Sequence, residues 1–312
     1  MSSGLFKFGS KKPTSPSLQN VLGNKTVSSG LGVKTKEMTK ATFDNYRNTI
    51  YKICGIYFTD SKKYLLESRI LKRINTLNLE TFERYLELIS SAGGRSELNN
   101  LFEAITINET YFFRAEAQFQ ALVNNVIPDI LKNNRNQKVF KFWSAASSTG
   151  EEAYTIAILI KEKLAPKYPG VTFQIHASDI DNNVIANAKN GIYKEYAVRN
   201  MPQEYREKYF VKKNELYHLS DEIKNMVKFQ NINLYDSLTM RTMKNFDIIF
   251  CCNVLIYFDI PSKQKVVSHL YDSLNNNAYL FIGYSESLHG VSKSFKLIHL
   301  PKAMTYKKEI NS

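Results

Sequence analysis

The 312-residue sequence contains few cysteines and no long hydrophobic run. Cys54, Cys251 and Cys252 form no Cys-x-x-Cys pair, and the five histidines lack metal-ligand spacing. We therefore expect a reducing compartment and no metal. The longest apolar run, Ile248 to Phe258, is too short to cross a bilayer, and the first thirty residues lack a signal-peptide core. These absences predict a soluble, cytoplasmic protein without membrane insertion.

Positive charge is abundant but unevenly distributed. The net charge of +13 first suggests a nucleic-acid partner. Residues 1–40, however, hold seven Lys and one Glu, so +6 of that charge lies in a segment rich in Ser, Gly, Lys and Thr. This segment shows no sustained apolar periodicity, which predicts a flexible basic tail. Because the tail inflates the charge, we expect no nucleic-acid partner.

Residues 41–107 have the apolar spacing of helices. Apolar side chains recur three or four residues apart, as on the buried faces of amphipathic helices: Phe43, Tyr46 and Ile50, then Leu66, Ile70, Ile74 and Leu77. This pattern predicts a small N-terminal helical domain over 41–107. Residues 108–115 then form a linker to a second domain.

Residues 116–312 alternate between apolar runs and helical segments, which is typical of an α/β domain with a parallel sheet. The predicted strands are Val139–Ala145, Phe173–Ser178, Val227–Phe229, Phe246–Cys252 and Ala278–Gly283. The predicted helices are Thr149–Ala165, Asp181–Asn190 and Pro261–Asn275. Charged, Tyr-rich sequence over 193–226 interrupts this alternation and predicts an inserted subdomain.

The turn after the first strand indicates the chemistry of a cofactor. Ser148 and Glu151 have capping-box spacing at the start of a helix, and such a strand-turn-helix crevice usually binds a ligand. Glu151 and Glu152 would repel a phosphate, and the turn lacks Gly-x-Gly-x-x-Gly. A cationic cofactor without phosphate, S-adenosylmethionine, fits better.

Acidic residues at the end of the second strand extend this interpretation. A carboxylate at the position of Asp179 can accept both hydroxyls of a ribose. Simpler explanations remain open, because Glu151 and Glu152 favour a helix N-terminus by charge alone. Either Asp179 or Asp181 could equally be only an N-cap.

Four ordered blocks resemble the chemotaxis methyltransferase family, which methylates receptor glutamates. They are ITINETYFFR (Ile105–Arg114), WSAASSTGEE (Trp143–Glu152), ASDID (Ala177–Asp181) and FCCNVLIYFD (Phe250–Asp259). The resemblance implies a helical domain followed by a Rossmann-like methyltransferase domain with a small antiparallel insertion. It also implies conversion of S-adenosylmethionine to S-adenosylhomocysteine during esterification of glutamates on cytoplasmic helices of chemoreceptors.

The resemblance also implies site residues. The cofactor would be bound by Asn108, Thr110, Arg114, Glu152, Asp179, Asn233, Leu234, Asn253 and Val254, while Arg114 and Tyr257 flank the transferred methyl. Arg69, Lys72 and Arg73 share one helical face, on which the family recognises its substrate, so we assign them to electrostatic docking. An ordinary solvated face is the alternative.

Three features depart from the family pattern. Members usually have a small residue or Leu near the position of Glu109. Cys252 stands where members usually have Arg. Members that bind a receptor's C-terminal pentapeptide carry a Gly-containing loop in the insertion, whereas Phe210–Leu216 is short and lacks Gly. We therefore expect binding without a pentapeptide tether.

The sequence leaves two other functions as alternatives and excludes a third. Amino-methylating nucleic-acid enzymes often carry Asn-Pro-Pro-Tyr where this chain has Asn253–Ile256. A non-catalytic module that binds the cofactor and receptor is a further alternative. A hydrolase fails because Gly283–Ser287 lacks the last glycine of a nucleophile elbow.

Overall fold

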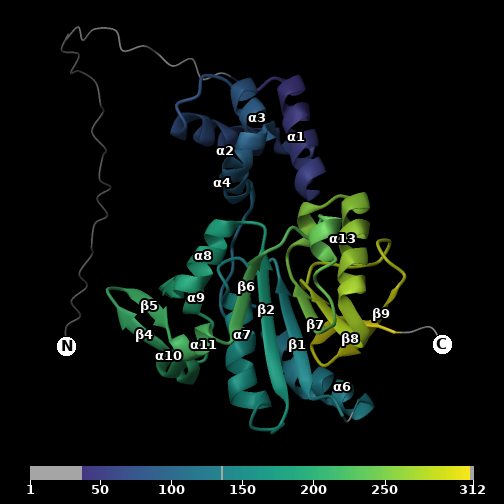
Figure 1. The fold of residues 1–312 in the computed structure, drawn as a ribbon. Helices are drawn as coiled ribbons and strands as arrows, with labels where there is room; N and C mark the ends of the chain where they lie inside the picture. Colours follow the sequence, from purple (N-terminus) through teal and green to yellow (C-terminus); the bar gives the residue numbers. More distant parts are fainter. Residues whose placement is uncertain (1–36, 135, 310–312) are drawn as a thin grey trace, which may run out of the picture. The chain divides into compact units, whose positions relative to one another are not determined.

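The computed structural model describes residues 37–134 and 136–309, so most of the tail predicted over 1–40 lies outside the described residues. The first part is helical (Figure 1), with α1 (Lys40–Cys54), η1 (Asp60–Lys62), α2 (Lys63–Thr76), α3 (Phe82–Ser90), η2 (Ala92–Gly94) and α4 (Arg95–Ile105). Thr39 caps α1 by accepting from the Thr42 amide, and Thr81 caps α3 in the same way. The apolar stripes predicted from sequence do form its core: Phe43, Tyr46, Ile50, Leu66, Ile70 and Ile74 are buried.

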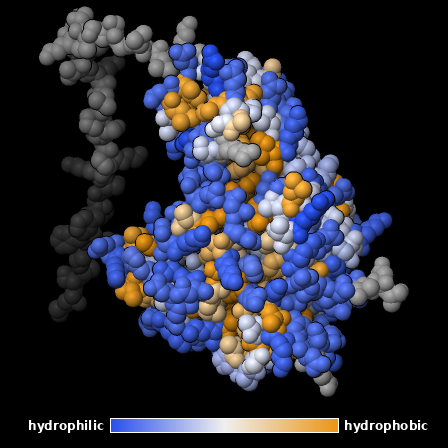
Figure 2. Space-filling view, viewed as in Figure 1, coloured by the Kyte–Doolittle hydropathy of each residue, from blue (hydrophilic) through white to orange (hydrophobic). Residues whose placement is uncertain are grey.

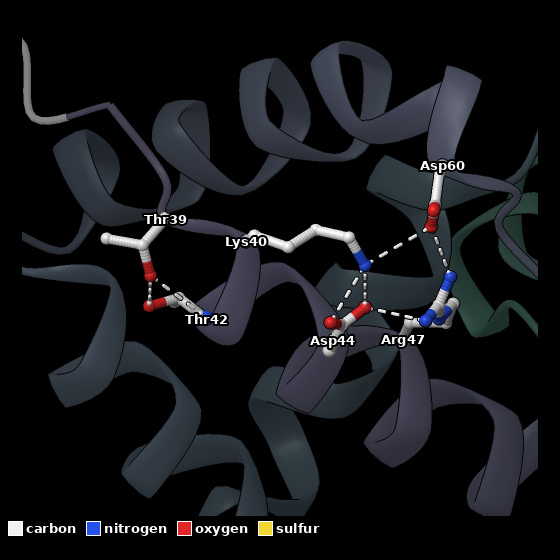
Figure 3. A network of polar contacts seen from close by, with 6 residues as sticks. All are labelled: Thr39, Lys40, Thr42, Asp44, Arg47 and Asp60. Carbon is white, nitrogen blue, oxygen red and sulfur yellow. Dashed lines mark hydrogen bonds and ion pairs between the residues drawn. The ribbon is translucent and has the colours of Figure 1, made fainter.

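A polar network joins the first turns of α1 to the segment before α2 (Figure 3). Lys40 Nζ lies 2.6 Å from Asp44 Oδ1 and 3.4 Å from Asp60 Oδ1. Arg47 pairs with both carboxylates at 2.6 Å. Exposed ion pairs of this kind contribute about 0–1 kcal/mol each to the free energy of unfolding. The main effect of the network is therefore to fix the position of η1 relative to α1.

A seven-stranded sheet forms the second part, in the order β6-β2-β1-β7-β8-β10-β9. The strands are β1 (Val139–Ala145), β2 (Thr172–Asp179), β6 (Val227–Asn231), β7 (Phe246–Cys251), β8 (Leu274–Ile282), β9 (Phe295–Leu300) and β10 (Ala303–Lys308). The pairs from β6 to β8 are parallel, as predicted, whereas β10 runs antiparallel to β8 and β9. Because β1 pairs with β2 on one side and β7 on the other, strand order reverses there, where α/β sheets bind ligands.

Helices connect the strands. They are α5 (Glu116–Ala121), η3 (Leu122–Val126), α6 (Ile127–Asn133), α7 (Glu151–Leu159), η4 (Ile160–Leu164), α8 (Asn182–Asn190), α12 (Ser237–Met240), η5 (Leu255–Tyr257) and α13 (Ile260–Ser273). Trp143 of β1 is fully buried, and its indole N–H donates to Ser178 Oγ on β2. The alternation of apolar strands and helices read from sequence therefore corresponds to a Rossmann-like sheet covered by helices.

The insertion is a separate antiparallel sheet on the β6 side of the main sheet (Figure 1). It contains β3 (Ile192–Lys194), α9 (Glu195–Val198), α10 (Gln203–Tyr209), β4 (Phe210–Lys213), β5 (Leu216–Leu219) and α11 (Asp221–Lys224), with strand order β3-β5-β4. Asn214 and Glu215, both at positive φ, form the two-residue turn between β4 and β5.

The surface seen in Figure 2 is mostly hydrophilic, with hydrophobic residues in small separate patches. Within residues 37–134 and 136–309, no helix is long and apolar enough to cross a membrane.

Candidate functional site

A cavity of about 910 Å³ opens where the strand ends, the linker and the helical domain meet. Its lining comes from segments far apart in the sequence: Cys54, Ile56 and Lys62, then Thr106–Tyr111, Arg114–Phe119, Ala146–Ser148, Glu152, Asp179–Ile180, Ile232–Leu234, Cys252–Val254, Ile256–Phe258, Ile282–Glu286 and residues of β10. A cavity of this size accepts a nucleoside-sized cofactor together with an acceptor side chain.

Every residue expected to bind the cofactor lines this one cavity, as does Tyr257: Asn108, Thr110, Arg114, Glu152, Asp179, Asn233, Leu234, Asn253 and Val254. They lie on the linker, on α7 and after β2, β6 and β7. The structure thus brings together residues that the sequence separates by more than a hundred positions, while their individual roles remain predictions.

Asp179 is held by the backbone of two turns. Its Oδ2 accepts from the Ser148 amide at 2.9 Å and its Oδ1 from the Asp181 amide at 3.1 Å. Only 5% of Asp179 is exposed, and this burial raises the pKa of its carboxyl to about 6. Asp181, not Asp179, is the N-cap of α8, accepting from the Asn183 amide at 2.8 Å. The N-cap alternative is therefore correct for Asp181 and leaves Asp179 available at the cavity.

The two adjacent glutamates of α7 point into different environments. Glu152 lines the cavity, accepts a hydrogen bond from Ser144 Oγ at 2.6 Å, and has its pKa raised to about 7 by burial. Glu151 is only 3% exposed and accepts instead from Thr149 Oγ1 at 2.7 Å. Glu152 is thus the acid of the pair that can meet a cationic ligand.

The predicted capping box at this turn is wrong. The N-cap of α7 is Gly150, at φ 93°, and no side chain caps the helix. Ser148 Oγ donates to the Asn108 carbonyl at 3.2 Å instead. The hydroxyl therefore joins the turn to the linker rather than to the helix.

Tyr257 and Arg114 lie on two segments that meet at the mouth of the cavity. Tyr257 donates from its hydroxyl to the Ile107 carbonyl at 3.1 Å. Burial raises the pKa of Tyr257, while the positive charges of Arg69 and Arg114 act in the opposite direction. Arg114 is exposed and donates to the Glu109 carbonyl at 2.8 Å. The phenol therefore lies in the field of two guanidinium groups.

Sequence reasoning missed Glu286, whose carboxylate joins the ends of β7 and β8. It accepts from the amides of Gly283 at 2.6 Å, Asn253 at 2.8 Å and Ile256 at 3.3 Å. A Cβ at Gly283 would lie 2.7 Å from the Glu286 carboxylate, so glycine is required there. The Gly283–Ser287 segment had been considered only as a nucleophile elbow, so this role was not predicted.

Gln118 on α5 was also missed. Its amide nitrogen donates to the Ile282 carbonyl at 2.7 Å, and Cys252 Sγ donates to its oxygen at 3.8 Å. Burial raises the pKa of the Cys252 thiol, so Cys252 places a neutral group beside Glu152.

The expectation that Arg69, Lys72 and Arg73 dock a substrate together needs correction. Arg73 forms two contacts with the buried Glu97, from Nε at 2.8 Å and from Nη2 at 3.0 Å, which neutralise its charge inside the helical domain. Arg69 is partly buried and donates to the Ile105 carbonyl at 2.5 Å. Lys72 is exposed. Arg73 therefore has an internal partner, and docking by Arg69 and Lys72 stays a prediction.

Exposed apolar side chains surround the mouth of the cavity. Tyr284 is 88% exposed, Ile107 54% and Ile256 51%, and all three belong to the cavity lining. The Glu286 contacts described above hold the segments of Tyr284 and Ile256 together. Exposed apolar side chains grouped beside a ligand cavity are typical of a protein-binding site.

The helical domain contacts the sheet domain directly. Asn233 Nδ2 donates to the Ile53 carbonyl at 2.7 Å, and the Tyr57 amide donates to the Tyr257 carbonyl at 3.0 Å. Ile56 forms an antiparallel bridge with Phe258. The end of α1 therefore helps to fix the backbone of the Tyr257 segment.

Metal ligands are not grouped in the described part of the chain, where no cluster of three or more His, Cys, Asp or Glu could hold an ion. The cysteines Cys54, Cys251 and Cys252 are free thiols.

Comparison with known proteins agrees with this geometry. The family model described as CheR methyltransferase, SAM binding domain, matches residues 108–304, and the CheR methyltransferase all-alpha domain matches residues 41–106. This chain belongs to the CheR methyltransferase family. Like the other members, it is an S-adenosylmethionine-dependent methyltransferase built from an all-helical domain and a cofactor-binding domain.

Curated relatives align over most of the CheR chain. Chemotaxis protein methyltransferase 2 of Vibrio cholerae is 35% identical over 87% of this chain and 94% of its own length. The chemotaxis protein methyltransferase of Borreliella burgdorferi is 33% identical over 87% of this chain and 95% of its own. A probable chemotaxis protein methyltransferase of Rhizobium etli is 34% identical over 78% and 91%.

Proposed function

We propose that this CheR methyltransferase esterifies glutamate side chains on the cytoplasmic helices of chemoreceptors, forming glutamate methyl esters in chemotaxis adaptation. The observation that carries the proposal is one cavity whose lining combines the acids Glu152 and Asp179 with Arg114 and Tyr257. The names of the curated relatives place such enzymes in chemotaxis. The free thiols support action in a reducing cytoplasm.

The residues present fit S-adenosylmethionine. Its ammonium and sulfonium match a cavity with buried carboxylates, and it has no phosphate that Glu152 would repel. We assign Glu152 to the ammonium and Asp179 to the ribose hydroxyls. The rest of the cofactor surface falls to Asn108, Thr110, Asn233, Leu234, Asn253 and Val254. When bound, the cofactor supplies an electrophilic methyl group and leaves as S-adenosylhomocysteine.

Positioning of the acceptor supplies the remaining catalysis. A glutamate with a pKa of about 4.3 is ionised at neutral pH, so no general base is required. Arg114 can hold the acceptor carboxylate by charge-assisted hydrogen bonds, and Tyr257 orients either the acceptor oxygen or the methionyl end of the cofactor. Arg114→Ala should therefore lower turnover by about 10²-fold.

The docking surface fits an acidic, amphipathic helix. Lys72 and Arg69 provide positive charge, whereas Ile107, Ile256 and Tyr284 provide apolar contact around the mouth. This apolar rim supports a protein rather than a nucleic-acid substrate. The tight β4–β5 turn at Asn214 and Glu215 supports binding without a pentapeptide tether.

The test is transfer of labelled methyl from S-adenosylmethionine to membranes that contain chemoreceptors, followed by treatment of the product with base. Label released as volatile methanol is the expected result, because carboxyl esters are base-labile. Cofactor binding without transfer would instead indicate a non-catalytic module. Label on nucleic acid would overturn the proposed substrate class. Membranes without receptors are the control.

A further inference from the structure

An exposed stack of charged and aromatic groups joins the insertion to the linker. The Arg199 guanidinium carbon lies 3.6 Å from the ring centre of Tyr111 and 3.5 Å from that of Tyr196. The Arg114 guanidinium carbon lies 5.7 Å from the centre of the same Tyr111 ring. Tyr111 therefore contacts both the guanidinium expected to hold the acceptor and a guanidinium of the insertion.

A second connection runs through Glu109. Tyr196 donates from its hydroxyl to Glu109 Oε1 at 2.6 Å, and Arg114 donates to the backbone carbonyl of the same glutamate at 2.8 Å. The Tyr111 and Tyr196 rings also meet edge to face, with centres 6.4 Å apart. Arg114 is thus connected to the insertion twice, by its guanidinium face and by its hydrogen bond.

The stack is not needed to attach the insertion. Ala197 and Val198 of α9 are buried in the main core, and the Phe112 amide donates to the Ala197 carbonyl at 2.9 Å. Phe112 itself packs on Tyr193 and Phe210, with ring centres 4.9 and 5.2 Å apart. Arg199 and Tyr196, by contrast, are exposed. Because Arg199 and Tyr196 are exposed, we expect them to affect the orientation of Arg114 more than the stability of the fold.

We propose that Arg199 is a positioning residue for methyl transfer, which orients Arg114 through the Tyr111 ring. The proposal gives the insertion a role in catalysis, and it rests on the assignment of Arg114 to the acceptor carboxylate. A guanidinium stacked on an aromatic face keeps a fixed plane, and Tyr111 passes this constraint to Arg114 on its own ring. An unconstrained Arg114 would sample many rotamers before meeting the acceptor.

The experiment compares Arg199→Ala with Arg206→Ala, which removes the same charge from α10 of the insertion. Acceptor turnover, acceptor KM and the Kd of S-adenosylmethionine are measured on the full chain. We expect Arg199→Ala to lower kcat by about tenfold with Kd unchanged, while Arg206→Ala leaves kcat as in the wild type. Tyr111→Phe, which keeps the ring, should retain turnover, and Tyr111→Leu should lose it to the same extent as Arg199→Ala.

Coupling between the two arginines provides the decisive control. If Arg199 acts through Arg114, the Arg114→Ala/Arg199→Ala double variant is no slower than Arg114→Ala alone. Additive losses, or an Arg199→Ala variant with wild-type kcat, would overturn the positioning role. If Arg199→Ala lowers both the affinity for the cofactor and the melting temperature, the role of Arg199 is structural instead. If Arg114→Ala keeps the turnover of the wild type, the assigned role of Arg114 is refuted. If the wild type itself transfers no methyl group, the proposed function is refuted.

Discussion

At the scale of single residues, the environment of each acid decides what it can do. Glu151 and Glu152 are adjacent in sequence, yet only Glu152 lines the cavity. Burial raises the pKa of both to about 7, so each is costly to ionise in the folded protein. A cationic ligand next to Glu152 would offset that cost, which gives cofactor binding a pH dependence.

The first prediction concerns this pH dependence. Only ionised Glu152 attracts an ammonium, so the affinity for S-adenosylmethionine should fall by up to about tenfold per pH unit as the pH drops below about 7. Glu152→Gln should bind weakly at every pH and lose most of this slope. Titration calorimetry at pH 6, 7 and 8 measures both. A wild-type Kd that stays constant over this range would contradict the assignment.

The same residue predicts an opposite effect on stability. A carboxyl whose folded pKa is raised stabilises the fold at low pH and loses that contribution as the pH rises through about 7. Glu152→Gln should therefore raise the unfolding free energy of the cofactor-free protein at pH 8, by up to about 3 kcal/mol. The gain should shrink toward zero below about pH 4.5. Urea unfolding at pH 4.5 and pH 8 checks the sign.

A second prediction separates the two kinds of basic residue on α2. Arg73→Ala leaves the buried Glu97 without its cation and should cost about 1–3 kcal/mol of unfolding free energy. Lys72→Ala should change stability by less than about 0.5 kcal/mol but raise the acceptor KM. Denaturant unfolding and steady-state kinetics on the two variants make the comparison. Equal effects on stability would contradict the internal role of Arg73.

At the scale of elements, the strands that could be predicted from the sequence are those with a clear apolar pattern. The bounds of β1 match the predicted strand because most of its residues are apolar and its last four, Phe142 to Ala145, are buried on both faces. The last two strands, β10 and the edge strand β9, were not predicted, since lysines and a histidine break their apolar pattern. They become strands through tertiary pairing, β10 with β8 and β9 with β10. The charged, Tyr-rich sequence of 193–226 predicted an inserted subdomain, but it did not show that Tyr193, Tyr209 and Tyr217 belong to the core.

The candidate site was predictable to the same extent. The ordered motifs and the pair Asn233-Leu234 located the central segments of the cavity, but not Gln118, Glu286 or the segments of residues 54–62 and 302–306. Gln118 and Glu286 contact the backbone groups of Ile282 and Asn253, which only tertiary folding brings near, so no spacing in the sequence could reveal them. The partner of Arg73 was hidden for the same reason, because Glu97 belongs to a different helix.

A third prediction tests the junction at the end of α1. Gly55 has φ 73°, and a Cβ there would lie 2.5 Å from the Tyr235 ring. Gly55→Ala should displace the segment that holds Tyr257, and we expect kcat to fall several-fold together with about 1–2 kcal/mol of stability. Gly290→Ala is the matched control, since its φ is 72° and, within the described residues, no atom lies within 4 Å of the added Cβ. Equal kcat values for the two variants would exclude this coupling.

At the scale of the whole molecule, the acids of the cavity and the exposed cation Lys72 of α2 should respond differently to salt. The Debye length falls from about 30 Å at 0.01 M to about 8 Å at 0.15 M ionic strength, and buried groups are screened much less than exposed ones. Raising the salt over this range should therefore increase the acceptor KM several-fold while the Kd of S-adenosylmethionine changes little. Lys72→Ala should flatten the dependence of KM on salt. Lys244→Ala should not, because Lys244 lies between α12 and β7 and does not line the cavity. A KM that does not depend on salt would mean that the apolar side chains of Ile107, Ile256 and Tyr284 provide most of the acceptor binding. In that case Tyr284→Ala should raise the acceptor KM more than Lys72→Ala does.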